Sequence, residues 1–119
     1  MSQDEKVYGK HYLVEFQGCT PSTISHTSFV EKALLKAVEI SQATYISHHV
    51  HQFSPQGVSA VVVIAESHFS IHTWPEDGYA AFDIFTCGED MKPKKAIEYL
   101  ATAFNAGNYS LQEISRGLP

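Results

Sequence analysis

The sequence predicts an α+β fold, a two-layer α/β sandwich in which two helices cover one face of a mainly antiparallel sheet. Three observations support it: two segments have apolar residues at helical spacing, the other segments are short and rich in β-branched and aromatic residues, and Gly- and Pro-containing breaks separate them. The expected order is β-α-β-β-β-β-α-β. Strands interrupted by only two helices favour an antiparallel sheet covered on one side. The length, 119 residues, indicates a single domain.

The N-terminal part is expected to hold one strand and one helix. Residues 12–16 are a short apolar run that ends at a cluster of breaker residues. Ser28 and Glu31 have the spacing of a capping box, which predicts a helix with Ser28 as its N-cap and an end near residue 42. The apolar stripe of this helix consists of Val30, Leu34 and Val38.

The middle of the chain is expected to form four strands. They are predicted at residues 44–53, 58–65, 69–74 and 79–87, with polar turns at 54–57 and 75–78 between them. The 69–74 strand alternates, which predicts two faces: Phe69, Ile71 and Thr73 on one, Ser70, His72 and Trp74 on the other.

A second helix and a last strand complete the fold. Pro93 suits the first turn of a helix, and Gly107 is the expected stop. The last strand is expected at residues 109–114. The predicted buried face of the helix consists of Ile97, Leu100, Ala101 and Phe104.

Charge and composition limit the partners. Eight Lys and Arg against 13 Asp and Glu give a net charge of −5, which disfavours binding to nucleic acid or to an anionic membrane surface. The longest apolar run, residues 60–65, is too short to span a bilayer, and the charged first residues do not resemble a signal peptide. Two cysteines, Cys19 and Cys87, make no disulfide framework. We therefore expect a cytoplasmic protein with free thiols.

Counting back from the turn at 75–78 brings a hydroxyl close to a thiol. If Trp74 pairs with Tyr79, Ser67 lies opposite Thr86, one step from Cys87, and a register shift of one residue would put it directly across from Cys87. His72 then lies on the opposite face from Ser67 and roughly 17 Å away along an extended strand. Either the chain turns at residues 67–68, or a second copy supplies the histidine.

The preceding hairpin gives a second expected pairing. With residues 54–57 as its loop, Phe53 pairs with Val58 and Gln52 with Ser59, so that an aromatic ring and a hydroxyl meet at one end of the sheet. The same strand carries three histidines, of which His49 and His51 share a face and His48 lies on the other. Without a third ligand they do not make a metal site, and no metal is expected.

These stretches closely resemble a known family. The segment Glu66-Ser67-His68, residues 71–76 (Ile-His-Thr-Trp-Pro-Glu) and residues 85–88 (Phe-Thr-Cys-Gly) resemble the bacterial and archaeal S-adenosylmethionine decarboxylase proenzymes. Residues 57–59 and 9–11 also fit. The resemblance covers about residues 9–105.

The resemblance implies a self-processing, pyruvoyl-dependent decarboxylase. The precursor would cut itself between Glu66 and Ser67 after the Ser67 hydroxyl attacks the Glu66 carbonyl, which gives a β chain of residues 1–66 and an α chain of residues 67–119. Ser67 would become a covalent pyruvoyl group, the pyruvate cofactor. Its carbonyl would form a Schiff base with the substrate amine and serve as the electron sink for decarboxylation.

The resemblance also implies roles for further residues and a partner. Ser59 and His72 assist processing, His72 as the proton acceptor, and Cys87 is the catalytic proton donor. The family builds its site at the interface of a homodimer of αβ units. Phe53 and Trp74 are expected to contact the adenine or the sulfonium of S-adenosylmethionine, because aromatic faces attract such cations. Glu76 is expected to bind the ribose.

Two alternatives stay open at this point. The same pyruvoyl chemistry could act on L-arginine or L-ornithine, because selectivity lies in the pocket rather than in the cofactor. The chain could also be an unprocessed, non-catalytic dimeric homologue. The favoured product, decarboxylated S-adenosylmethionine, is an aminopropyl donor for spermidine and other polyamines.

Overall fold

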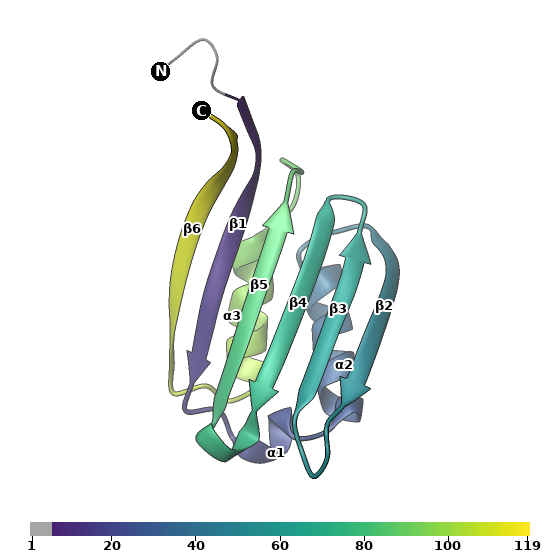
Figure 1. Cartoon of the computed structure of the whole chain (residues 1–119), viewed down its shortest axis with the longest axis vertical. Helices are drawn as coiled ribbons and strands as arrows, with labels where there is room; N and C mark the ends of the chain where they lie inside the picture. Colours follow the sequence, from purple (N-terminus) through teal and green to yellow (C-terminus); the bar gives the residue numbers. More distant parts are fainter. Residues whose placement is uncertain (1–5) are drawn as a thin grey trace.

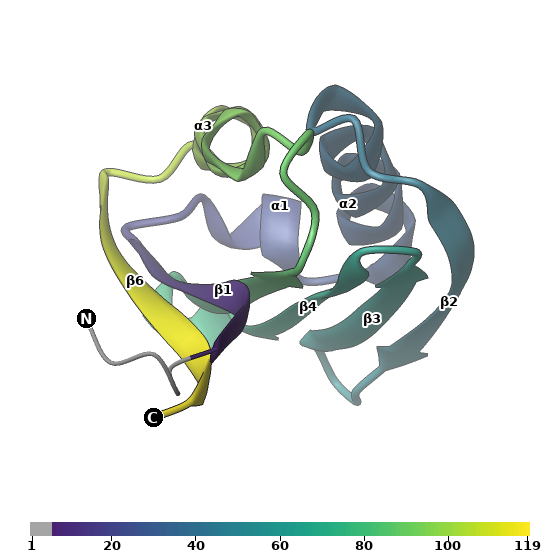
Figure 2. The same ribbon diagram turned by 90° about the horizontal axis from the view of Figure 1, so that it is seen from above.

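The structure is a computed structural model that describes residues 6–119, and it consists of one antiparallel sheet with all helices on one face (Figures 1 and 2). The six strands lie in the order β2-β3-β4-β5-β1-β6. The predicted two-layer α+β sandwich is confirmed. The elements are β1 (Lys6–Gln17), α1 (Pro21–Ile24), α2 (Thr27–Ile40), β2 (Tyr45–Gln52), β3 (Val58–Ile64), β4 (Ser67–Trp74), the 3-10 turn η1 (Pro75–Asp77), β5 (Tyr79–Thr86), α3 (Pro93–Ala103) and β6 (Asn108–Leu118).

The core lies between the sheet and the helices α2 and α3. Alternate residues of β1, β3, β4 and β5 point into it, as the period of a half-buried strand requires. The two faces predicted for the 69–74 strand are confirmed, because Phe69, Ile71 and Thr73 are buried and the residues between them are not. None of the helices within residues 6–119 has the length and apolar character needed to cross a bilayer.

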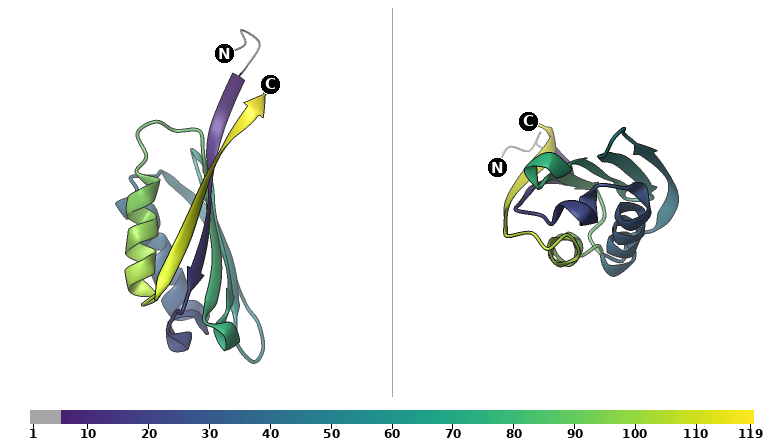
Figure 3. Two further views of the ribbon diagram at one scale, coloured as in Figure 1. Left: turned by 90° about the vertical axis from the view of Figure 1, so that its left-hand side faces the viewer. Right: turned by 90° about the horizontal axis from the view of Figure 1, so that it is seen from below.

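The strands β1 and β6 are both longer than predicted. They pair along their whole length, and their far ends project beyond the other strands as a twisted ribbon (Figure 3). Residues 6–11 therefore belong to β1, although they are too polar to have been assigned to a strand from the sequence. Their pairing with the C-terminal residues, more than a hundred positions away, supplies the ordering that local sequence does not.

The start of α2 and the residue that ends α3 differ from the sequence predictions. The helix α2 starts at Thr27 with His26 as its N-cap, and no side chain caps it, so the Ser28 capping box is wrong. Glu31 is engaged elsewhere, with its Oε2 2.9 Å from Nε2 of His48 on β2. After α3, Asn105 rather than Gly107 takes the left-handed conformation, with φ of 51°.

The two predicted hairpin registers had different outcomes. The β4–β5 pairing is confirmed, with Trp74 opposite Tyr79 and Ser67 opposite Thr86. The β2–β3 pairing is wrong by one residue, because Gln52 lies opposite Val58, and His51 opposite Ser59. The loop contains one residue more than predicted, since the N–H of Phe53 donates to the carbonyl of Gly57, 2.8 Å away.

The face of the sheet that points away from the helices has no covering layer within the described residues (Figure 3). Val61 and Val63 of β3 are 40% and 41% exposed on it. We call this surface the open face. Because the strand period alternates, His68, Ser70, His72 and Trp74 also lie on it.

Candidate functional site

The peptide bond between Glu66 and Ser67 lies at the end of a tight turn. Ile64 and Ser67 pair across β3 and β4, which leaves only Ala65 and Glu66 to connect the strands. Ser67 has a φ of 147°, a value that residues other than glycine rarely adopt. Such a conformation costs roughly 1–3 kcal/mol and is found mainly at functional sites. The backbone is therefore strained at the residue whose hydroxyl was expected to react.

The carbonyl of Glu66 is held by two donors from one residue. The backbone N–H of Cys87 lies 2.9 Å from the oxygen, and its thiol Sγ lies 3.2 Å from the same oxygen. Two donors on one carbonyl oxygen stabilise the negative charge that develops there when a nucleophile attacks the carbon. We call Glu66, Ser67 and Cys87 the scissile group. Strain on one side of the bond and charge stabilisation on the other fit an amide that is activated for cleavage.

Five further predicted residues meet at the other end of the sheet. A pocket of about 290 Å³ is lined by Phe53, Ser59, His72, Trp74 and Glu76, together with Gln56, Gly57 and Thr73. The hydroxyl of Ser59 lies 2.8 Å from Nδ1 of His72, directly across the β3–β4 pairing. Phe53 and Trp74 are 47% and 42% exposed, and Trp74 stacks on Tyr79 with one face of its ring, so the exposed parts of both rings are accessible to a ligand. We call the five predicted residues the pocket group.

The scissile group and the pocket group do not meet within one chain. The strand β4 runs without interruption from Ser67 to Trp74 and pairs with both neighbours from Ser67 to His72, so the chain does not turn at residues 67–68. Ser67 and His72 therefore stay five residues, about 17 Å, apart. A turn of the chain at residues 67–68, which was one of the two ways to bring Ser67 and His72 together, is thereby excluded.

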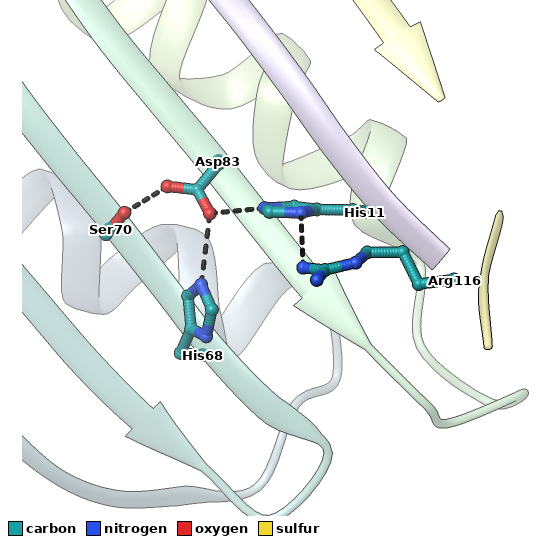
Figure 4. Close-up of polar contacts among 5 residues, drawn as sticks. All are labelled: His11, His68, Ser70, Asp83 and Arg116. Carbon is teal, nitrogen blue, oxygen red and sulfur yellow. Dashed lines mark hydrogen bonds and ion pairs between the residues drawn. The ribbon is translucent and has the colours of Figure 1, made fainter. Parts of the chain in front are cut away.

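A third cluster, drawn in Figure 4, lies on the open face and includes His68 and Ser70, which lie on β4 between Ser67 and His72. One carboxylate oxygen of Asp83 lies 2.7 Å from Nε2 of His11 and 3.0 Å from Nε2 of His68, and the hydroxyl of Ser70 donates to the other oxygen. Burial alone would raise the pKa of Asp83, but the hydrogen bonds from Ser70, His11 and His68 outweigh it and hold this pKa below its ordinary value. Asp83 is therefore the charged centre of a polar network.

The spacing of this cluster resembles a metal site, but its hydrogen bonds do not. The ligand-type atoms of His11, His68 and Asp83 lie within 4.8 Å of one another. However, Nη1 of Arg116 lies 3.4 Å from Nδ1 of His11, and a guanidinium can only donate. Nδ1 is then the acceptor, so the proton of a neutral His11 ring is on Nε2, where it points at Asp83 rather than leaving a lone pair for a metal.

Sequence reasoning missed this network and one other residue, Thr44. The predicted β4–β5 register places Asp83 opposite Ser70, two residues from His68 on the same face of the sheet, which could have indicated these contacts. The contribution of His11 depends on the pairing of β1 with β5, which hairpin counting does not reveal. Thr44 donates two hydrogen bonds to the Glu66 carboxylate from 22 positions away, and no local pattern indicated it.

Comparisons with known proteins point to one family. Residues 10–117 match the family model described as S-adenosylmethionine decarboxylase. The chain is 47% identical over 109 residues to the S-adenosylmethionine decarboxylase proenzyme of Acidithiobacillus ferrooxidans, covering 92% of this chain and 82% of that protein. The proenzyme of Pyrococcus horikoshii is 44% identical over 110 residues, covering 92% and 79%. The crystal structure of the adenosylmethionine decarboxylase from Aquifex aeolicus superposes with a TM-score of 0.88 at 37% identity, covering 97% of this chain and 95% of that one.

Proposed function

The chain belongs to the S-adenosylmethionine decarboxylase family, and from this premise we propose that it cuts itself between Glu66 and Ser67 and uses the resulting pyruvoyl group for catalysis. It is an enzyme that decarboxylates S-adenosylmethionine. The relatives carry that name rather than the name of an arginine or ornithine decarboxylase, and they are named proenzymes. We propose that the product donates aminopropyl groups in polyamine synthesis.

The proposed cleavage begins at the scissile group. Oγ of Ser67 attacks the carbonyl carbon of Glu66, the amide nitrogen leaves as an amine, and an ester replaces the amide. A base then removes the Cα proton of Ser67, and the C–O bond breaks to release Glu66 as a carboxylate and leave a dehydroalanine. This end tautomerises to an imine, which water hydrolyses to the pyruvoyl ketone with release of ammonia. The φ of Ser67 and the two donors on the Glu66 oxygen support the first step.

The remaining residues have proposed roles in decarboxylation, in proton transfer during processing and in substrate binding. The pyruvoyl carbonyl supplies the electron sink for the carbanion that forms as carbon dioxide leaves. The thiol of Cys87, which lies beside the scissile bond, donates a proton to the substrate Cα. The hydrogen-bonded pair Ser59 and His72 handles protons during processing, with His72 as the acceptor. Phe53 and Trp74 present aromatic faces to the adenine and the sulfonium, and Glu76 accepts hydrogen bonds from the ribose hydroxyls.

A second copy of the chain is needed to bring these roles together. We propose a homodimer in which two open faces pack against each other with their strands running in opposite directions. The end of β4 that carries the scissile group in one copy would then lie over the pocket group of the other, which bridges the separation of about 17 Å along the strand. The unusual backbone of Ser67, with φ of 147°, would turn its hydroxyl from the face that Phe69 and Ile71 share towards the open face. The exposed Val61 and Val63 of the open face supply apolar surface for such a contact.

The setting follows from the chemistry of the thiol. Cys87 must stay reduced to act as a proton donor, and Cys19 and Cys87 are both free. We therefore infer a reducing, cytoplasmic environment.

One observation carries the proposal: the Glu66 carbonyl accepts from both donors of Cys87 while Ser67 is strained. The test follows freshly synthesised protein by denaturing intact-mass analysis over time. We expect two fragments, residues 1–66 and 67–119, with a borohydride- and hydrazine-reactive carbonyl on the second. Labelled carbon dioxide should be released from S-adenosylmethionine and not from arginine or ornithine. A chain that stays whole and lacks a reactive carbonyl would contradict the proposal.

A further inference from the structure

Thr44 ties the link between α2 and β2 to the turn that carries the scissile bond. Its N–H lies 3.0 Å from Oε1 of Glu66, and its hydroxyl lies 3.1 Å from Oε2 of the same carboxylate. Its own carbonyl accepts the N–H of Ala65 at 2.9 Å. Three hydrogen bonds thus connect one threonine to the two residues before the bond that is cleaved.

The turn has a shape that two-residue hairpins normally avoid. Tight connections of this length favour turns with positive φ at their central residues, because these turns match the twist of the strands. Neither Ala65 nor Glu66 has a positive φ, and the positive φ occurs at Ser67 instead. The unfavourable positive φ is therefore found at Ser67, the residue whose hydroxyl is proposed to react.

The side chain of Glu66 is confined from both sides. Thr44 binds its carboxylate, and Gly88 lies against its aliphatic part. A Cβ at position 88 would lie only 2.7 Å from Cγ of Glu66. A side chain at position 88 would therefore force the Glu66 side chain to shift from its present position on Thr44. The same confinement keeps the Glu66 carbonyl beside the two donors of Cys87.

We propose that Thr44 is a positioning residue for the self-cleavage, which holds Glu66 so that the strained turn and the alignment of its carbonyl with Cys87 persist. The inference rests on the proposed function. Thr44 touches neither the attacking hydroxyl nor the scissile carbonyl, and it acts through the Glu66 carboxylate. A displacement of about 1 Å at a reacting centre can slow a reaction roughly a hundredfold. Loss of the hydrogen bond from the Thr44 hydroxyl to the Glu66 carboxylate should therefore reduce the cleavage rate by about tenfold to a hundredfold.

The experiment compares cleavage rates of newly synthesised precursors by denaturing electrophoresis. Thr44→Val, which removes the hydroxyl donor at nearly constant shape, should cleave about tenfold to a hundredfold more slowly, whereas Thr44→Ser should cleave at a rate close to wild type. Gly88→Ala, which displaces Glu66 from the opposite side, should also slow cleavage. Thr102→Val makes the same change at an exposed threonine of α3 and should have no effect.

Two further readouts separate positioning from a loss of stability. The same variants are placed in a Ser67→Ala background, where no chain can cleave, and their thermal unfolding is compared. If Thr44 is a positioning residue, Thr44→Val should leave the unfolding temperature in the Ser67→Ala background unchanged. In the chain that keeps Ser67, Thr44→Val should accumulate less of the ester between Glu66 and Ser67, which hydroxylamine cleaves. Once matured, Thr44→Val should turn over substrate at the wild-type rate per reactive carbonyl.

The outcomes distinguish this inference from the proposed function. A wild-type chain that stays whole would remove the proposed function and this inference with it. A wild-type chain that cleaves while Thr44→Val keeps pace would overturn the positioning role alone. Slow cleavage of Thr44→Val with an equally lowered unfolding temperature and no rescue by serine would also overturn it. Slow cleavage with rescue and unchanged unfolding supports it.

Discussion

The backbone N–H and the thiol of Cys87 both lie within hydrogen-bonding distance of one oxygen, the carbonyl oxygen of Glu66, at 2.9 and 3.2 Å. In the proposed reaction one cysteine therefore serves two steps: its N–H would stabilise charge during cleavage, and its thiol would be available as an acid afterwards. The two contributions can be separated by mutation, since only the thiol depends on the side chain.

Replacement of Cys87 by alanine should separate the two steps. The N–H remains on the Glu66 oxygen, so the precursor should still cleave, although more slowly. Turnover by the matured chain should fall by about 10²- to 10⁴-fold, the range for loss of a general acid. The measurement is carbon dioxide release per reactive carbonyl. Undiminished turnover would reject Cys87 as the proton donor.

Replacement of Ser67 by alanine should leave a single chain. Without the hydroxyl no ester can form, so denaturing mass analysis should give one species of full length and no reactive carbonyl. Ser47→Ala, at an exposed position of β2, is the control and should cleave normally. Two fragments from Ser67→Ala would show that the nucleophile has been assigned to the wrong residue.

Mixed dimers test whether two copies build each site. Ser67→Ala and His72→Ala should each be inactive alone. In a mixed dimer, one site combines both defects, while the other combines an intact Ser67 with an intact His72. Co-expression with two affinity tags should therefore restore about half of the wild-type activity per dimer. If each site were built within one chain, both sites would stay defective and no activity would return.

Asp83→Asn should weaken the fold most at neutral pH. The pKa of Asp83 is lowered in the folded state, so its charge contributes stability above the pKa of the unfolded chain, and this contribution is lost as the pH falls through the folded value. We expect a loss of about 1.5–3 kcal/mol near pH 7, because three donors lose a charged acceptor. Urea unfolding at neutral and strongly acidic pH measures the difference, which should shrink in acid. Asp77→Asn, at an exposed position, is the control.

Tyr79 should titrate unusually late. Burial and a hydrogen bond to the carboxylate of Glu15 raise the pKa of its phenol to about 12. The raised pKa means that the folded state favours the neutral phenol, which contributes to the stability of the fold. This contribution is complete below the pKa of Tyr79 in the unfolded chain and is lost as the pH rises through about 12. The difference in ultraviolet absorbance between wild type and Tyr79→Phe after a rapid pH jump gives the midpoint. Glu15→Gln should lower it, and an unshifted midpoint in wild type would contradict the contact.

The parts of the fold that were predicted correctly depend on local signals. The turn at residues 75–78 has strong turn chemistry, ending in Gly78 with φ of 60°, so counting outward gave the right partner for Ser67. The same method failed at Phe53, because its N–H bonds to Gly57 and lengthens the loop by one residue. The spacing of a capping box was present at Ser28, but Glu31 of the helix is engaged by His48 of the strand β2.

The parts of the site that could not be predicted depend on contacts between distant segments. Residues near the scissile bond could be found because a family motif contains them. Thr44 and His11 reach the site through a loop after α2 and through the pairing of β1 with β5, and neither contact leaves a local pattern. The strain at Ser67 is likewise a property of backbone angles, which residue types do not specify.

The strand order has a consequence for the two chains that the proposed cleavage after residue 66 would produce. The N-terminal fragment contributes β1, β2 and β3, the C-terminal fragment contributes β4, β5 and β6, and the two sets interleave in the order β2-β3-β4-β5-β1-β6. Three of the five strand interfaces, β3–β4, β5–β1 and β1–β6, then join different fragments. Because separation of the fragments would break these three interfaces, the sheet itself would hold the two chains together after the proposed cleavage, and their unfolding would become dependent on protein concentration.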